Sequence, residues 1–135
     1  MSIKKYAVSP SARLVLVDAK GEPMTNEAGK EVAVNVYGPG SKEFARARAS
    51  QNNRMMDKLK AKGKSEQTAE QTAKETAMFL AECTAGFENM EYDDTLTGDA
   101  LAIAIYSDSS IGFITENVNK FIGDWANFLP TSTKS

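Results

Sequence analysis

The chain has 135 residues, 41% of them hydrophobic and 25% charged, a balance that is typical of one globular domain with a modest core. Its net charge of −2 predicts no general attraction to nucleic acid or membranes, and no apolar run is long enough to cross a bilayer. It has no histidine, which excludes the usual general base and the commonest metal ligand. Its single cysteine, Cys83, excludes an internal disulfide, and this suits a reducing cytosol.

The N-terminal part of the domain predicts an antiparallel β-hairpin. Residues 14–17 are a short apolar run, and in residues 32–36 every second position is valine, the period of a half-buried strand. The intervening residues 18–31 carry Gly21, Pro23, Asn26 and Gly29, which are turn formers. We expect residues 1–12 to form an N-terminal arm and residues 13–129 to form a single domain.

A glycine–proline joint follows the second strand. Gly38 and Gly40 can adopt positive φ, Pro39 cannot continue a strand ladder, and Ser41 is a good N-cap for a helix. The spacing is not that of a phosphate-binding Walker loop. We therefore interpret the segment as a structural joint, with an anion site at the helix N-terminus as the alternative.

Two helices are predicted next. The first covers residues 41–61, has a narrow apolar stripe and ends at Gly63. The second begins near Ser65 or Thr68, because Thr68 and Gln71 have capping-box spacing, and its predicted buried face extends to Phe87.

The C-terminal part predicts two further helices. Residues 99–106 alternate in a way that also suits a strand, but recurring alanine and the polar residues that follow favour a short helix. Asp108 is expected to cap a last helix over residues 109–129, which Pro130 ends, and residues 130–135 are expected to be a disordered tail. The predicted fold class is α+β, an N-terminal antiparallel β-hairpin followed by a bundle of three to four α-helices.

Charge is distributed unevenly along the chain. Residues 42–64 hold eight bases and two acids, whereas residues 66–108 hold ten acids and one base, Lys74. Three interpretations stay open: attraction within one monomer, head-to-tail self-association, and nucleic-acid binding by the basic helix 42–64. The self-association surfaces would comprise Arg46, Arg48, Arg54, Lys58, Glu66, Glu70, Glu75 and Glu82. The nucleic-acid interpretation would use Arg46, Arg48, Arg54, Lys58, Lys60 and Lys62, although this segment lacks the aromatic cluster that stacks bases.

Aromatic residues recur along the last predicted helix, at Phe113, Phe121, Trp125 and Phe128. Such a stripe either packs in the core or grips a partner helix. The carboxylates between Glu91 and Asp99 do not have the spacing of an EF-hand loop, and we interpret them as a solvated acidic connector. No set of residues predicts catalysis, and we expect no enzymatic activity and no cofactor or metal.

Two stretches resemble a known family. "VYGPGSKEFARARASQNNRMM" from Val36 and "ALAIAIYSDSSIGFITENVNKFIGDWANFL" from Ala100 are similar to the tail assembly chaperones of long-tailed (siphovirus-type) bacteriophages. The first resembles the passage from a hairpin into a helix, and the second a Y-x-D-x-S-I-G-F-I segment that leads to an amphipathic helix. The resemblance covers residues 14–129.

The resemblance implies a non-enzymatic role. Members of the family bind the tape measure protein and keep it soluble while the tail tube assembles, in the host cell cytoplasm, and are absent from the mature virion. In many phages a programmed frameshift makes a longer product whose added domain brings in the tail tube protein, and this chain would be the short product. Client contact is expected through Phe113, Phe121, Trp125 or Phe128, whichever are not fully buried.

Overall fold

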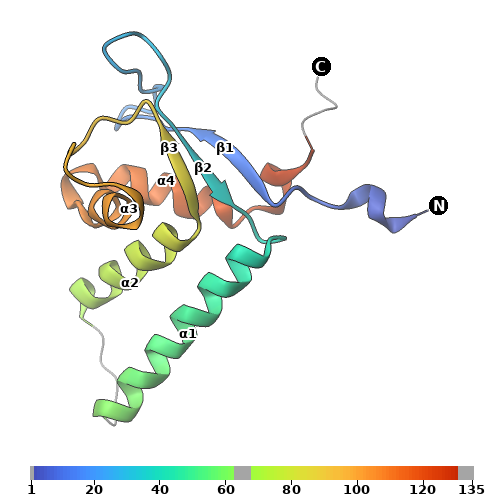
Figure 1. Ribbon diagram of the computed structural model, residues 1–135, viewed down its shortest axis with the longest axis vertical. Coiled ribbons are helices and arrows are strands. Elements are labelled where there is room, and N and C mark those ends of the chain that lie inside the picture. The colour runs from blue at the N-terminus through green and yellow to red at the C-terminus, as the bar shows by residue number, and fades with distance from the viewer. Residues whose placement is uncertain (1, 63–67, 131–135) are drawn as a thin grey trace.

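The computed structural model describes residues 2–62 and 68–130, with the side chains of residues 61 and 62 left out, and has the expected α+β class. Its elements, in chain order, are η1 (Ile3–Tyr6), β1 (Ser11–Val15), β2 (Ala33–Tyr37), α1 (Lys42–Lys62), α2 (Ala69–Glu82), β3 (Thr84–Glu88), α3 (Gly98–Ser107), η2 (Ser109–Ile111), α4 (Gly112–Ile122) and η3 (Trp125–Phe128). Figure 1 shows a small sheet with α4 crossing behind it, and α1 and α2 leading away from it together. The predicted disordered tail, except Pro130, and the expected stop at Gly63 lie outside the described residues.

The predicted hairpin is confirmed. β1 pairs with β2 in antiparallel register, with Ala12 opposite Val36 and Leu14 opposite Val34. The long connection is folded back by two turns, because the side chains of Asp18 and Asn26 each accept hydrogen bonds from two backbone amides further on. Two isolated antiparallel bridges, Val17 with Pro23 and Thr25 with Glu31, also form within this connection. Residues 18–31 are therefore folded into turns and bridges and do not form an irregular loop.

The second helix is shorter than predicted, and a strand follows it. Thr68 and Gln71 form the expected capping box, but α2 ends at Glu82, and β3 pairs antiparallel with β2. The helical spacing of Phe87 fits the buried face of a longer α2, but an apolar residue at this position suits a strand equally well. In β3, Phe87 packs on Tyr106 with ring centroids 6.0 Å apart. β3 gains ladder hydrogen bonds from β2, and this gain is not visible in the local sequence.

The last helix is interrupted. The structure has a short 3₁₀ turn at η2, where Asp108 accepts from the Ser110 amide as expected of a cap, then α4, and then a second 3₁₀ turn, η3. The predicted single helix over residues 109–129 is therefore wrong. Asp124 explains the break, because its carboxylate accepts a 3.0 Å hydrogen bond from the Ala126 amide and so begins a new turn.

The glycine–proline joint works by close approach and not by positive φ. Gly38 and Gly40 are absent from the residues with positive φ, but a Cβ at Gly38 would overlap the ring of Phe128. Ser41 caps α1 as expected, accepting a 3.0 Å hydrogen bond from the Phe44 amide while its hydroxyl donates to the Gly38 carbonyl at 2.8 Å. The joint thus holds the start of α1 against the C-terminal turn.

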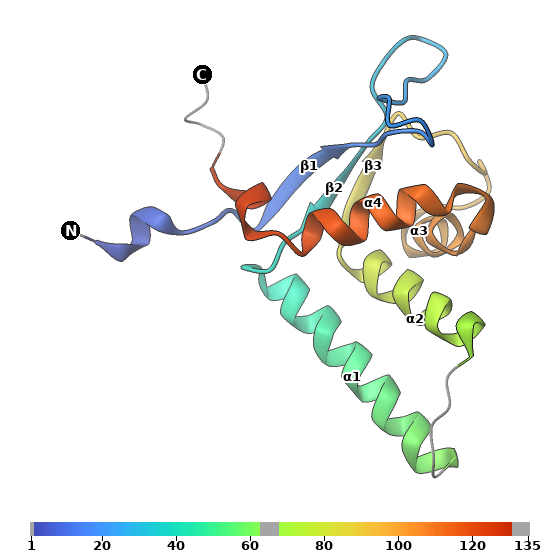
Figure 2. The same cartoon turned by 180° about the vertical axis from the view of Figure 1, so that it is seen from behind.

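One hydrophobic core joins the sheet to the helices. Figures 1 and 2, from opposite sides, agree that α4 lies across one face of the sheet and that the far part of α1 extends away from it. The largest buried side chains are Leu16, Val34, Val36, Leu80, Cys83, Ile105, Ile114, Val118, Ile122 and Phe128. The sheet, α2, α3, α4 and η3 all contribute to this core, whereas from α1 it receives only Ala47 as a fully buried residue and Phe44 as a partly buried one.

Candidate protein-binding surfaces

Polar side chains hold α1 against α2. Arg54 Nε lies 2.9 Å from Glu75 Oε1, Lys58 Nζ lies 3.1 Å from Glu75 Oε2, and Arg54 Nη1 lies 3.5 Å from Glu82. Glu75 is only 7% exposed. Burial raises the pKa of its carboxyl, but hydrogen bonds from Arg54 and Lys58 outweigh burial and hold this pKa below its ordinary value.

A third base of α1 is also engaged within the chain. The guanidinium of Arg48 stands 5.2 Å from the ring centroid of Phe44 and 4.7 Å from that of Phe79, within the range of cation–π interactions. Five charged side chains therefore interact inside one monomer, as in the first of the three interpretations of the charge asymmetry. They are Arg48, Arg54, Lys58, Glu75 and Glu82. These contacts reduce the number of cations that α1 can offer to nucleic acid or to a second copy.

The remaining residues of the expected self-association surfaces lie apart. Arg46 and Glu70 are exposed, on α1 and at the start of α2 respectively, and each lines a different surface hollow. Glu66 lies outside the described residues. The structure thus joins four of the predicted residues in intramolecular ion pairs, Arg54, Lys58, Glu75 and Glu82.

The four aromatic residues predicted for client contact have different surroundings. Phe128 is fully buried and packs on Phe121 with ring centroids 5.5 Å apart, so it does not meet the condition of an exposed ring. Phe113 and Phe121 are half-buried against the core. Trp125 is 57% exposed, which leaves it as the strongest candidate of the four.

The chain fixes Trp125 on a rigid turn. Beside the Asp124 cap, Asn127 Nδ2 donates to the Phe121 carbonyl at 2.9 Å, and the Ser9 amide donates to the Phe128 carbonyl at 2.7 Å. A Cβ on Gly40 would lie 2.7 Å from Val8 Cγ2 and 3.5 Å from Trp125 Cζ3. Val8, Gly40 and Trp125 therefore form one patch, the Trp125 surface, built from three distant parts of the sequence.

A second apolar patch lies on the distal half of α1. Met55, Met56 and Leu59 are 46%, 54% and 39% exposed, and we call them the α1 face. These three residues belong, with Phe44 and Ala47, to the narrow apolar stripe that the sequence predicts for this helix. The structure shows that packing uses Phe44 and Ala47 near the start of the helix, whereas Arg54 and Lys58 meet α2 further along it.

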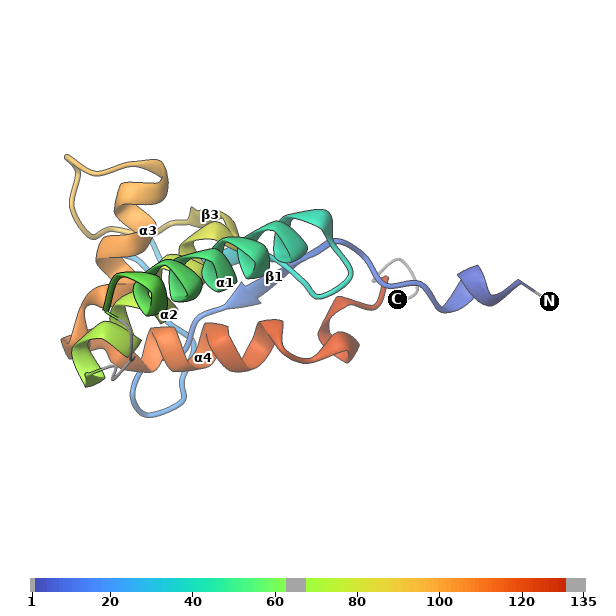
Figure 3. The same ribbon diagram turned by 90° about the horizontal axis from the view of Figure 1, so that it is seen from below.

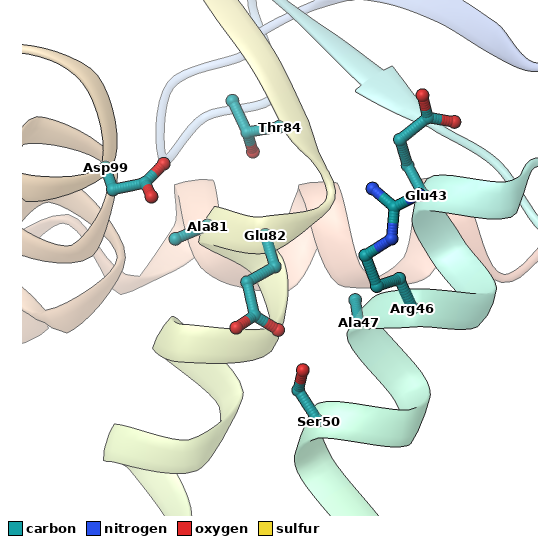
Figure 4. A pocket seen from close by; sticks show the side chains of 8 residues that line it. All are labelled: Glu43, Arg46, Ala47, Ser50, Ala81, Glu82, Thr84 and Asp99. Carbon is teal, nitrogen blue, oxygen red and sulfur yellow. The ribbon is translucent and has the colours of Figure 1, made fainter.

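Two hollows lie beside the pair formed by α2 and α3. The acidic hollow, of about 220 Å³, is lined by Glu43, Arg46, Ala47, Ser50, Ala81, Glu82, Thr84 and Asp99, from α1, α2, β3 and α3 (Figure 4). The apolar hollow, of about 460 Å³, is lined by Glu70, Gln71, Ala73, Lys74, Ile103 and Ser107. Three carboxylates against one guanidinium suit the acidic hollow to a cationic side chain.

The groups with the most strongly perturbed pKa values belong to the core. Burial, with a contribution from the Glu82 charge, raises the pKa of the Cys83 thiol to about 12. Burial likewise raises the pKa of the Tyr106 hydroxyl, which shares a 2.8 Å hydrogen bond with Thr84. A thiol held protonated in this way is a poor nucleophile, so the geometry assigns Cys83 a packing role.

The part of the chain that the structure describes holds neither a metal-binding cluster nor a helix that could span a membrane. Within residues 2–62 and 68–130, no three side chains of the types that bind metals are grouped to hold an ion. No helix among these residues has both the length and the apolarity needed to cross a membrane. Comparisons with family models, curated proteins and solved structures found no match for this chain.

Proposed function

We propose that this protein is a phage tail assembly chaperone, which binds the largely helical tape measure protein and keeps it soluble during tail tube assembly. The observation that carries the proposal is the exposed Trp125, held on an anchored turn beside Val8 and Gly40. A tryptophan indole offers a large apolar contact area with few rotatable bonds, and such residues dominate the energetics of many protein interfaces. The family resemblance in the sequence supports the same role.

The surroundings of Trp125 favour a pre-organised contact. Three hydrogen bonds hold the turn that carries Trp125: one from its Asp124 cap, one to the end of α4 and one from Ser9. Binding of a client therefore orders little additional backbone. Less ordering means that more of the interaction energy contributes to affinity. A client helix that places an apolar residue on the indole would bind with this smaller ordering cost at every chaperone molecule along the client.

The α1 face supplies a second contact for the same client. Met55 and Met56 have flexible, polarisable side chains that adapt to different partners, as suits a chaperone that contacts many different segments of one long protein. The bases that remain exposed on α1, such as Arg46 and Lys60, would attract acidic positions of the client.

The remaining parts of the proposal follow from the role. The protein acts in the host cell cytoplasm, associates with itself along the client, and is absent from the mature virion. The tail tube protein is a partner only of a longer frameshifted product. We propose no nucleic-acid role, because Arg54 and Lys58 are engaged in ion pairs with Glu75 and Glu82.

Co-expression with the tape measure protein tests the proposal. Wild-type chain is expected to shift the tape measure protein from the pellet to the soluble fraction and to co-purify with it. Trp125→Ala is expected to lower the soluble yield severalfold while its circular dichroism spectrum and thermal unfolding stay normal. Tyr92→Ala removes a comparably exposed ring from the connector before α3 and serves as the matched control, with unchanged yield.

The two possible failures have different meanings. If wild-type chain leaves the tape measure protein insoluble, the proposed function is wrong. If Trp125→Ala and Tyr92→Ala solubilise it equally well, the function stands and Trp125 is not the contact.

A further inference from the structure

The first residues of the described chain form an exposed arm. Residues 2–10, which we call the arm, contain η1 with no buried residue, and Ile3 and Tyr6 are 81% and 62% exposed. The arm is nevertheless folded, because the Ser2 side chain accepts a hydrogen bond from the Lys4 amide and the Ala7 amide donates to the Lys4 carbonyl. An ordered segment that presents two large apolar side chains to water indicates an unoccupied contact.

The base of the arm is fixed to the domain. The Ser9 amide donates to the Phe128 carbonyl, and the Pro10 carbonyl accepts from the Gly38 amide at 2.9 Å. Beyond this anchor the arm leads away from α2 and α3, as Figure 3 shows from below. The anchor therefore directs the arm away from α2 and α3 of its own domain.

The two hollows beside α2 and α3 form one surface that fits such an arm. Asp99, Ile103 and Ser107 are spaced by four residues and so lie on one stripe of α3. Asp99 lines the acidic hollow, and Ile103 and Ser107 line the apolar hollow, with residues of α2 on the opposite side of each. We call this surface, which runs from Glu82 and Asp99 to Glu70 and Ile103, the α2–α3 groove.

The arm and the α2–α3 groove are complementary in charge and polarity. Besides Ile3 and Tyr6, the arm carries Lys4 and Lys5 and no acid. The groove pairs an apolar hollow, whose volume of about 460 Å³ can hold a large side chain, with a hollow that is lined by three carboxylates and one arginine. Two apolar and two basic side chains on one segment thus match an apolar and an acidic hollow on one surface.

We propose that the arm of one copy docks in the α2–α3 groove of a second copy. Ile3 or Tyr6 enters the apolar hollow against Ile103, and Lys4 or Lys5 approaches Asp99 and Glu82. Because the arm and the groove are different surfaces, the contact is heterologous and continues from copy to copy as a chain or a closed ring. This inference deepens the self-association in the proposed function by naming the surfaces, and it needs no client.

Sedimentation velocity of the full chain over a concentration and salt series tests the inference. Wild type is expected to form species larger than a dimer, and these should dissociate as salt rises because exposed charge contacts are screened. Tyr6→Asp and Ile103→Asp should each weaken association at least about tenfold, the effect of losing one interface anchor. Tyr92→Asp, at a site that is 42% exposed and outside both surfaces, should associate like wild type.

Mixing the two defective variants gives the sharpest result. A Tyr6→Asp copy keeps an intact groove and an Ile103→Asp copy keeps an intact arm, so the mixture should form a one-to-one dimer that grows no further. A mixture that stays monomeric, a wild type that stays monomeric at high concentration and low salt, or single variants that associate like wild type would each overturn the inference. Any of these results can coexist with normal client solubilisation, so the proposed function is judged separately.

Discussion

Replacing Glu75 with glutamine should loosen α1 from the rest of the domain. The substitution keeps the shape of the side chain but removes the charge that faces Arg54 at 2.9 Å and Lys58 at 3.1 Å. Exposed ion pairs contribute up to about 1 kcal/mol, and breaking a buried pair costs about 3–5 kcal/mol. Glu75 is buried while its partners are partly exposed, so we expect the free energy of unfolding to fall by about 1–3 kcal/mol.

The pH dependence of this loss identifies its cause. Because the folded-state pKa of Glu75 is lowered, its contribution is complete above the ordinary value of 4.5 and disappears as pH falls through the folded-state pKa. Urea unfolding of wild type and Glu75→Gln should therefore differ most at neutral pH and converge as the pH falls below 4.5 through the folded-state pKa. Glu116→Gln, an exposed site on α4, serves as the control and should change stability by less than about 0.5 kcal/mol. A loss for Glu75→Gln that is equally large at acidic pH would refute the ion-pair explanation.

Two further substitutions or treatments test the core. Gly38→Ala places a methyl group against the ring of Phe128 and should lower the free energy of unfolding in urea by about 1–3 kcal/mol. In the control, Gly112→Ala, the added methyl group meets open space and should be neutral or slightly stabilising. Equal effects of the two substitutions would contradict the close-approach explanation. Cys83, fully buried and with its pKa raised to about 12, should not react with a disulfide reagent at pH 8 until denaturant unfolds the chain, and rapid labelling of the folded protein would show that the thiol is accessible.

Elements defined by neighbouring residues could be predicted from the sequence. The alternation of valine in residues 32–36, the Ser41 cap and the Thr68–Gln71 capping box each use partners within a few positions, and each is present in the structure. The prediction of a short helix at α3 was also correct, because alanine favours helix where alternation alone is ambiguous.

Elements defined by distant residues could not be predicted in this way. β3 exists because β2 supplies its hydrogen-bond partners from some fifty residues earlier in the chain, as the pairing of Ala33 with Glu88 shows. The end of α4 combines a local signal, the Asp124 cap, with a distant one, the packing of Phe128 against Gly38. A stripe with helical spacing cannot reveal such a break, since Phe121 before it and Trp125 after it are both apolar.

The candidate surfaces show the same limit. The opposite charges of the segments now seen as α1 and α2 were evident, but whether they meet within one molecule depends on how the two helices pack, and the Arg54–Glu75 pair shows that at least part of the attraction is internal. Exposure separated Trp125 from Phe128, which occupy equivalent places in the sequence pattern. The sequence predicts an N-terminal arm over residues 1–12, but it does not show that Ile3 and Tyr6 are exposed, because these two apolar residues form no periodic pattern.

The most direct test of the account is a pull-down of the tape measure protein by this chain from cells that express both, without other phage proteins. The account predicts a soluble complex that contains several copies of this chain for each tape measure molecule and that is depleted by Trp125→Ala. A tape measure protein that stays insoluble and unbound beside folded, abundant wild-type chain would contradict it.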